Sequence, residues 1–150
     1  MRSKFFYFFL FLLFLTSCGY KPIYSSKNLN FTIDNINKNN TSLNNKFAKS
    51  IYALVNKEAN RKIDININSN KIIKIKSKDP KGNALVFELE IYLKFSILNL
   101  NNKTEKLFSK KITYNNSEDK FKLRQYENEL EDILITKIVE DLINYLSNME

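Results

Sequence analysis

Few side chains in this sequence are suited to covalent or acid–base chemistry. The 150 residues include no histidine and a single cysteine, Cys18. Histidine-based catalysis, Cys/His zinc sites and disulfides within the chain are therefore excluded. Two carboxylates, Glu88 and Glu90, lie two residues apart in an extended segment and project from one face. An outward pair of this kind is normally just solvated, because a tuned carboxylate needs burial or a converging partner. We therefore expect that the protein is not an enzyme and binds no metal ion.

Lysines form the second group of candidate functional residues. Lys74, Lys76 and Lys78 alternate along an extended segment, on the side opposite Ile73 and Ile75, and Lys81 follows inside the turn Asp79–Asn83. Such a row of cations is suited to contacts with lipid phosphates. The same row also keeps an edge strand from pairing wrongly. Both explanations remain open, and the four lysines are the candidate lipid-binding residues. A second basic set, Lys120, Lys122 and Arg124, begins a predicted helix, where the helix dipole disfavours cations.

The overall charge is a weaker guide to partners. The formal net charge is +8, and the Lys, Asn and Ile that dominate the composition all have codons rich in A and T. Residues 18–117 carry 18 basic and 7 acidic side chains, whereas residues 118–150 carry 4 basic and 9 acidic ones. The two parts should therefore produce opposite electrostatic fields. No nucleic-acid motif or interleaving of aromatics with basic residues is found, so nucleic acid is not an expected partner.

The N-terminus has the pattern of a secretory signal. Arg2 and Lys4 precede Phe5 to Leu15, a run of Phe and Leu with one Tyr and no charge. These residues would rise only about 16 Å as a helix. A transmembrane helix must cross about 30 Å of hydrocarbon. The run is therefore too short for a mature transmembrane helix, and residues 1–17 are predicted to be a signal peptide.

Cys18 lies directly after this run. Leu15-Thr16-Ser17-Cys18 resembles the bacterial lipobox, in which small residues precede a cysteine that receives diacylglycerol before cleavage. The resemblance implies a mature chain that begins at a multiply acylated Cys18, with no cofactor besides this covalent lipid. More than one acyl chain is needed for stable anchoring. Gly19 stands where lipoproteins retained in the inner membrane commonly have Asp, which implies sorting to the outer membrane.

Apolar periodicity predicts six elements after a tether at residues 18–28. The pattern predicts a strand at 29–33, a loop at 35–40 and a helix that Thr41 or Ser42 caps and that ends near Asn60. One long or broken strand at 63–75 leads to the turn at 79–83. The next strand has seven apolar odd positions from Leu85 to Ile97, followed by a hairpin at 99–103, a strand at 108–114 and a helix from about Ser117, with an apolar stripe from Tyr126 to Leu146.

The order β-α-β-β-β-α and the single apolar face of each element predict an α+β fold. We expect residues 29–150 to form one two-layer domain, with a mostly antiparallel sheet of about four strands and both helices packed on one face. The other face of the sheet should be polar and open.

The start of the mature chain also points to a family. Cys18-Gly19-Tyr20-Lys21-Pro22-Ile23-Tyr24 resembles the mature start of the lipopolysaccharide-assembly lipoprotein family LptE. The order of the later elements is similar to that of the family, in the matching stretches 73–82, 85–97, 108–114 and 126–146.

This resemblance implies a function in binding and assembly. LptE proteins plug a large outer-membrane β-barrel, LptD, and assist delivery of lipopolysaccharide to the outer leaflet. The expected partners are therefore an LptD-like barrel, lipopolysaccharide and the membrane. The expected location is the periplasmic side of the outer membrane. The alternatives are another periplasmic lipoprotein adaptor of envelope assembly and a hydrolase that works through carboxylates.

Overall fold

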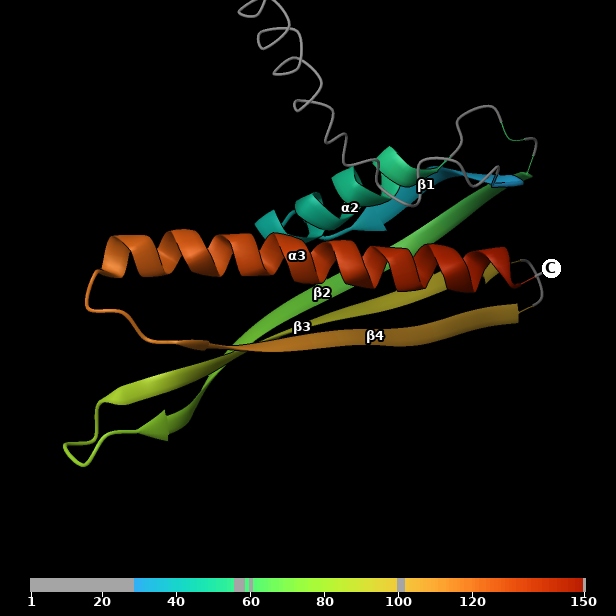
Figure 1. Cartoon of the computed structure of the whole chain (residues 1–150). Coiled ribbons are helices and arrows are strands. Elements are labelled where there is room, and N and C mark those ends of the chain that lie inside the picture. The colour runs from blue at the N-terminus through green and yellow to red at the C-terminus, as the bar shows by residue number, and fades with distance from the viewer. Residues whose placement is uncertain (1–28, 56–58, 60, 100–101, 150) are drawn as a thin grey trace, which may run out of the picture.

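The computed structural model describes residues 29–55, 59, 61–99 and 102–149. The predicted signal peptide, the tether and Cys18 lie outside these residues. The element order β-α-β-β-β-α is confirmed (Figure 1). The elements are β1 (Phe31–Lys38), α2 (Ser42–Leu54), β2 (Arg61–Lys78), β3 (Ala84–Asn99), β4 (Asn102–Asn115) and α3 (Lys120–Ser147).

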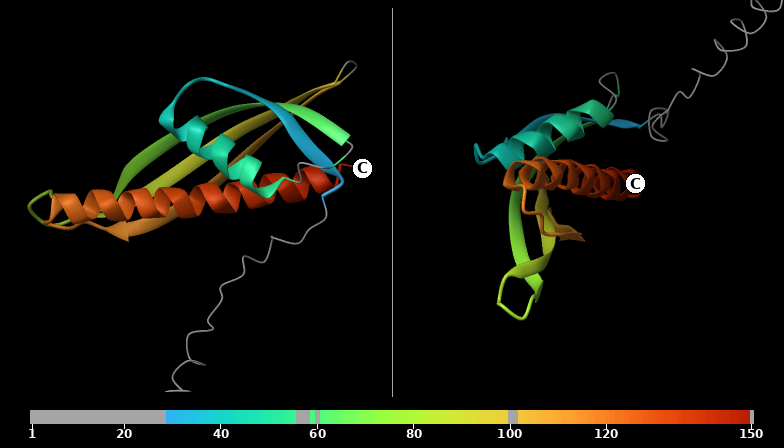
Figure 2. Two further views of the ribbon diagram at one scale, coloured as in Figure 1. Left: turned by 90° about the horizontal axis from the view of Figure 1, so that it is seen from above. Right: turned by 60° about the vertical axis from the view of Figure 1, so that its left-hand side comes forward.

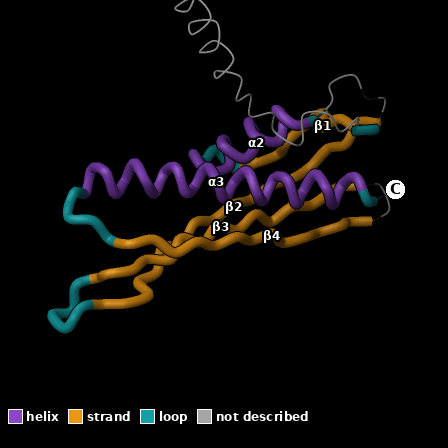
Figure 3. Tube along the Cα trace, in the orientation of Figure 1, coloured by secondary structure: helices purple, strands orange, loops and turns teal. Residues whose placement is uncertain are grey.

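The four strands form one sheet in the order β1-β2-β3-β4. β1 and β2 are parallel and α2 connects them, whereas β2–β3 and β3–β4 are antiparallel hairpins. Both helices cover the same face of the twisted sheet (Figures 2 and 3), and the opposite face is open. The predicted two-layer α+β architecture is therefore confirmed.

The core lies between the helices and the middle of the sheet. In β3 the odd-numbered residues from Leu89 to Phe95 are almost completely buried. They meet the apolar stripe of α3, including Leu134, Ile138 and Leu142, while Phe47 and Ile51 of α2 complete the layer. Burial of one large apolar side chain stabilises a fold by about 1.5–3 kcal/mol, so these facing rows dominate its stability.

Predicted boundaries are wrong at β1, at α2 and at β4, which begins at Asn102 instead of residue 108. β1 continues to Lys38 through the stretch expected to be a loop, because a register irregularity between Ile33 and Ile36 interrupts the alternation of apolar residues. α2 ends at Leu54 instead of near Asn60, since Val55 takes an extended backbone and buries its side chain in the core. The predicted N-cap is confirmed, because the Thr41 hydroxyl accepts a hydrogen bond from the Asn44 backbone N–H at 3.2 Å.

β2 is one unbroken strand despite the polar residues in its middle. Ser69 and Lys71 occupy the side of the strand that faces the helices, where an apolar residue would be expected. The Ser69 N–H and hydroxyl both donate to the side-chain oxygen of buried Asn44. The Lys71 ammonium donates to Glu131 of α3 at 2.6 Å. Each polar side chain therefore has a helix partner that satisfies it inside the layer.

Glu131 joins the two helices to the sheet. Its buried carboxylate accepts from Lys46 of α2 at 2.7 Å and from Lys71 of β2 at 2.6 Å. Burial by itself would raise the pKa of Glu131, but the hydrogen bonds from the two ammonium groups outweigh it and hold the pKa below its ordinary value. The carboxylate therefore stays charged and bridges three elements.

Candidate functional site

The end of the β2–β3 hairpin, residues 73–87, projects beyond the helices and is called the tip below. Figure 1 shows it curving away from the start of α3 to a turn at the lower left. The 28 residues of α3 span about 42 Å. The 18 residues of β2 span about 59 Å. The helix is thus too short to cover the hairpin along its whole length.

Asp79 organises the turn of the tip. Its carboxylate accepts the backbone N–H groups of Lys81 at 2.9 Å and Asn83 at 2.8 Å, and the side-chain amide of Asn83 at 2.9 Å. The hydrogen bonds from Asn83 lower the pKa of Asp79, so the carboxylate is ionised at neutral pH. Gly82 supplies the positive φ of 87° that the turn requires. The turn therefore presents Lys81 from a hydrogen-bonded backbone.

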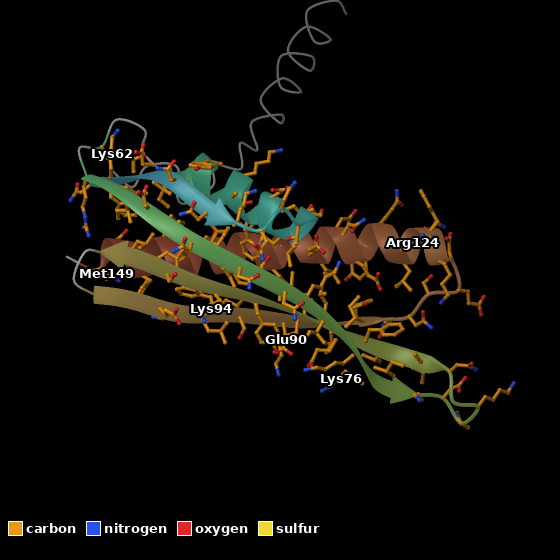
Figure 4. The ribbon with its side chains drawn as sticks, turned by 180° about the vertical axis from the view of Figure 1, so that it is seen from behind. Lys62, Lys76, Glu90, Lys94, Arg124 and Met149 are labelled. Atoms are coloured by element: carbon orange, nitrogen blue, oxygen red, sulfur yellow. The ribbon has the colours of Figure 1, made fainter. Side chains whose placement is uncertain are left out.

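The four candidate lysines fall into two pairs. Lys74 and Lys76 lie on the open face, where Lys74 forms an ion pair with Glu90 at 2.8 Å and Lys76 with Glu88 at 3.5 Å. Lys76 and Glu90 are labelled in Figure 4. The hydrogen bond from Lys74 lowers the pKa of Glu90 and raises that of Lys74. Lys78 and Lys81 have no ion-pair partner within the part of the chain that the structure describes. Their charges are the ones available to an anion.

The expectation that Glu88 and Glu90 are simply solvated is wrong for both residues. The side chain of Glu90 is 15% exposed and pairs with Lys74, and Glu88 is covered further. This residue is only 7% exposed, although it lies on the open face of the sheet. Lys111 of β4 is a second cation beside it, at 3.9 Å. The aliphatic parts of long lysine side chains can cover a neighbouring carboxylate in this way. Glu88 therefore has a structural ion-pair environment.

Apolar side chains accompany the lysines at the tip. Ile73, Ile75 and Leu85 are 43%, 51% and 50% exposed, although their positions belong to the helix-facing side of the hairpin. Leu85 was expected in the core, so that prediction is wrong. Phe87 is half-buried and stacks on Tyr114 with ring centroids 5.5 Å apart. The tip thus combines uncovered aliphatic groups with two unpaired lysines.

The start of α3 adds further exposed groups. Phe121 is exposed, and so is Tyr126, which was expected on the buried stripe. The Tyr126 ring instead forms a T-shaped contact with the Tyr114 ring, with ring centroids 6.3 Å apart. In the second basic set, Lys120 donates to Asn116 and Ser117, and Lys122 forms an ion pair with its own N-cap, Asp119. The ammonium groups of Lys120 and Lys122 thus contact residues at the N-terminus of α3.

Sequence patterns did not identify the apolar half of the tip. Ile73, Ile75 and Leu85 continue the alternation of the buried strand, so periodicity alone assigns them to the core. The lengths of the predicted elements could have revealed their exposure, because the predicted strands extend further than the helices that must cover them. Within the described ranges, no cluster of three or more acidic or metal-binding side chains could hold a metal ion. None of the described helices is long and apolar enough to cross a membrane.

The sequence matches no protein-family model and no curated protein. Solved structures define the class of the fold. Rare lipoprotein B from Shewanella oneidensis aligns with a TM-score of 0.56 and 12% identity over 76% of this chain and 94% of that one. A minor lipoprotein from Acinetobacter baumannii aligns with a TM-score of 0.56 and 12% identity over 79% of this chain and 93% of that one. Lipoprotein B from Nitrosomonas europaea aligns with a TM-score of 0.53 and 14% identity over 86% of this chain and 90% of that one. The described domain therefore has a fold found in bacterial lipoproteins.

Proposed function

We propose that this chain is an outer-membrane lipoprotein of the LptE type, which assists assembly of lipopolysaccharide as the partner and plug of a large LptD-like β-barrel. Cys18 carries the lipid that holds the domain at the periplasmic side of the outer membrane. The protein acts by binding and has no catalytic residues. The fold shared with bacterial lipoproteins and the Cys18-Gly19-Tyr20 start support this assignment.

The observation that carries the lipid part of the proposal is the composition of the tip. Lipopolysaccharide has acyl chains beside phosphate groups. The tip places uncovered Ile73, Ile75 and Leu85 on the same short hairpin as the unpaired Lys78 and Lys81. Apolar contact and charge-assisted hydrogen bonds to phosphate would act together on such a ligand. Lys74 and Lys76 take a lesser part, because Glu90 and Glu88 already hold their ammonium groups.

The partner is tested by purification from membranes. The full-length chain with a C-terminal tag is extracted from outer membranes in mild detergent, captured, and its stable partners are identified by mass spectrometry. A large β-barrel in an amount comparable to the tagged chain is expected. A Cys18→Ala chain treated in the same way is the control, because a partner that it captures has bound the domain after the cells were broken and not at the membrane. Recovery of only other lipoproteins or peptidoglycan-linked proteins would overturn the barrel assignment and favour the alternative, an adaptor of another envelope-assembly system.

A further inference from the structure

β2 has a neighbouring strand on both sides along only part of its length. β1 pairs with β2 from Arg61 to Ile67, whereas β3 pairs with it as far as Lys78. Residues 71–75 of β2, called the free edge below, therefore have β3 on one side and no strand on the other among the described residues. Beyond Ile75 the register of β2 with β3 becomes irregular. Figure 1 shows this part of β2 running past the ends of β1 and α2.

The backbone of the free edge has hydrogen-bonding groups that point outward. Asn44 accepts the Ser69 N–H on the side where β1 has ended. Alternate residues of a strand direct their N–H and C=O groups to the same edge, so Lys71, Ile73 and Ile75 share this direction. The Lys71 N–H is taken by the neighbouring Asn70 side chain at 2.9 Å. The N–H and C=O groups of Ile73 and Ile75 have no such partner within the described ranges.

Side chains beside the free edge differ between its two faces. Exposed Ile73 and Ile75 lie on the helix-facing side, and Lys74 and Lys76 lie on the open side. The side chains of Lys74 and Lys76 are about half exposed, whereas those of Glu90 and Glu88, which they contact, are only 15% and 10% exposed, so the accessible charge beside the free edge is positive. An added strand would thus meet apolar groups on one face and an excess of positive charge on the other.

This pattern discriminates between partners. Pairing of the free edge with the same edge of a second copy would bring lysines against lysines, and like charges opposite each other destabilise a sheet. A strand with acidic residues on one face and aliphatic residues on the other would complement both faces.

We propose that the free edge of β2 binds an extended segment of a partner protein in which acidic and apolar residues alternate. The segment adds to the sheet as a further strand next to β2. Backbone hydrogen bonds to Ile73 and Ile75 provide the pairing, and Lys74 and Lys76 select acidic side chains. This surface shares Ile73 and Ile75 with the lipid contacts proposed for the tip. The inference does not rest on the proposed function, because strand addition uses the backbone groups of the free edge and does not require lipid binding.

The first test uses a labelled peptide in which Val and Glu alternate, added to the full-length chain in neutral detergent and followed by fluorescence anisotropy. We expect saturable binding that weakens with salt. A peptide with Lys in place of Glu should bind about tenfold more weakly or not at all. Two further peptides carry N-methyl groups on all Val or on all Glu residues. Only the set whose N–H groups face β2 should abolish binding, which also reveals whether the added strand is parallel or antiparallel.

The second test locates the contact on the protein. Amide hydrogen exchange of Ile73 and Ile75 should be fast in the free chain and slower with the Val/Glu peptide, while that of Ile72 and Lys74, which face β3, stays slow throughout. The double variant Ile73→Ser/Ile75→Ser should weaken peptide binding. The variant Ile133→Ser, which changes an exposed isoleucine of α3, is the matched control and should leave binding unchanged.

Three results would overturn the inference. The first is equal binding of the Glu and Lys peptides, and the second is equal binding of the two N-methylated peptides, whether strong or weak. The third is slowing of the Ile73 and Ile75 amides with protein concentration alone, because it would identify a second copy of the chain as the occupant. Failure of lipopolysaccharide binding or of barrel capture would leave the inference intact, since neither experiment measures pairing of an added strand with the backbone of the free edge.

Discussion

The side-chain oxygen of Asn44 accepts hydrogen bonds from both the backbone N–H of Ser69, at 2.9 Å, and its hydroxyl, at 2.6 Å. The Asn44 amide nitrogen donates to the carbonyl of Asn39 at 3.1 Å. These contacts form where β1 leaves the sheet and β2 would otherwise have an unsatisfied N–H. One buried helix residue therefore replaces a strand partner and fixes α2 against β2.

Replacing this residue should destabilise the fold. In Asn44→Ala, the N–H and the hydroxyl of Ser69 lose their acceptor inside the layer, whereas the Asn39 carbonyl keeps the hydrogen bond from the Thr41 N–H. A buried polar group left without a partner costs about 1–3 kcal/mol, and we expect a loss of about 2 kcal/mol in the free energy of unfolding. Urea unfolding followed by circular dichroism measures the loss. The variant Asn45→Ala, one position away on the exposed side, should change stability by much less, and equal losses would contradict the assigned role.

The middle of the fold was predictable because its periodicity is regular. Leu89, Ile91 and Leu93 alternate with polar residues, and the stripe of α3 repeats about every four residues. The contribution of Asn44 was not predictable, since a polar helix residue facing a strand resembles any exposed one. The end of β1 was missed for a related reason, because the irregularity at Ile33–Ile36 breaks the alternation.

Ion pairs on the open face depend on register, which the sequence leaves undetermined. Lys74 and Glu90 are 16 residues apart and meet only because of how β2 and β3 align. Lys74 and Lys76 lie together on the open face, but register irregularities interrupt β2 before Lys78, and the division of the lysines into paired and unpaired charges could not be predicted. The exposure of Ile75 and Leu85 similarly follows from where α3 begins, and periodicity carries no information about that position.

The Glu131 cluster should make stability depend on pH. The pKa of Glu131 is lowered in the folded protein, so its contribution is complete above the ordinary carboxyl pKa and is lost as the pH falls through the folded value. Glu131→Gln should be less stable than the parent at pH 7, by about 1–3 kcal/mol for charge-assisted bonds. The difference should shrink as the pH falls below about 4.3. Urea unfolding of both proteins at pH 7 and below pH about 4.3 measures this difference in the free energy of unfolding. A difference that does not change with pH would contradict the ion-pair explanation.

Removal of the unpaired lysines should affect lipid binding most. Lys78→Gln/Lys81→Gln is expected to weaken binding to purified lipopolysaccharide by about tenfold at low salt, with a smaller effect at high salt. Lys74→Gln/Lys76→Gln should have less effect, because Glu90 and Glu88 already hold these charges. Lys49→Gln/Lys137→Gln, two exposed lysines on the helices, is the charge-matched control. Equal effects of all three double variants would indicate nonspecific attraction.

Asp79 should matter for the order of the tip and not for the core. Asp79→Ala removes the acceptor for the N–H groups of Lys81 and Asn83, so both amides should exchange faster with solvent. The thermal midpoint of the domain should hardly change, because the turn lies beyond the helices. Asp79→Asn keeps an acceptor oxygen and should retain slower exchange than the alanine variant. Unchanged exchange in Asp79→Ala would show that the backbone bonds between Asp79 and Asn83 are sufficient.

Cys18→Ala should uncouple the domain from the membrane. The apolar run before Cys18 is too short to serve as a transmembrane helix. Without a cysteine there is no acceptor for acylation, so the chain should fail to partition with outer membranes, although the tip could still bind lipopolysaccharide in solution. Fractionation measures the partitioning, and intact-mass analysis of the parent should show added acyl groups at an N-terminal Cys18. The parent without added mass, or a variant still acylated elsewhere, would contradict the lipobox assignment. A variant that still binds lipopolysaccharide but captures no barrel would show that the anchor serves assembly with the partner and not recognition of the lipid.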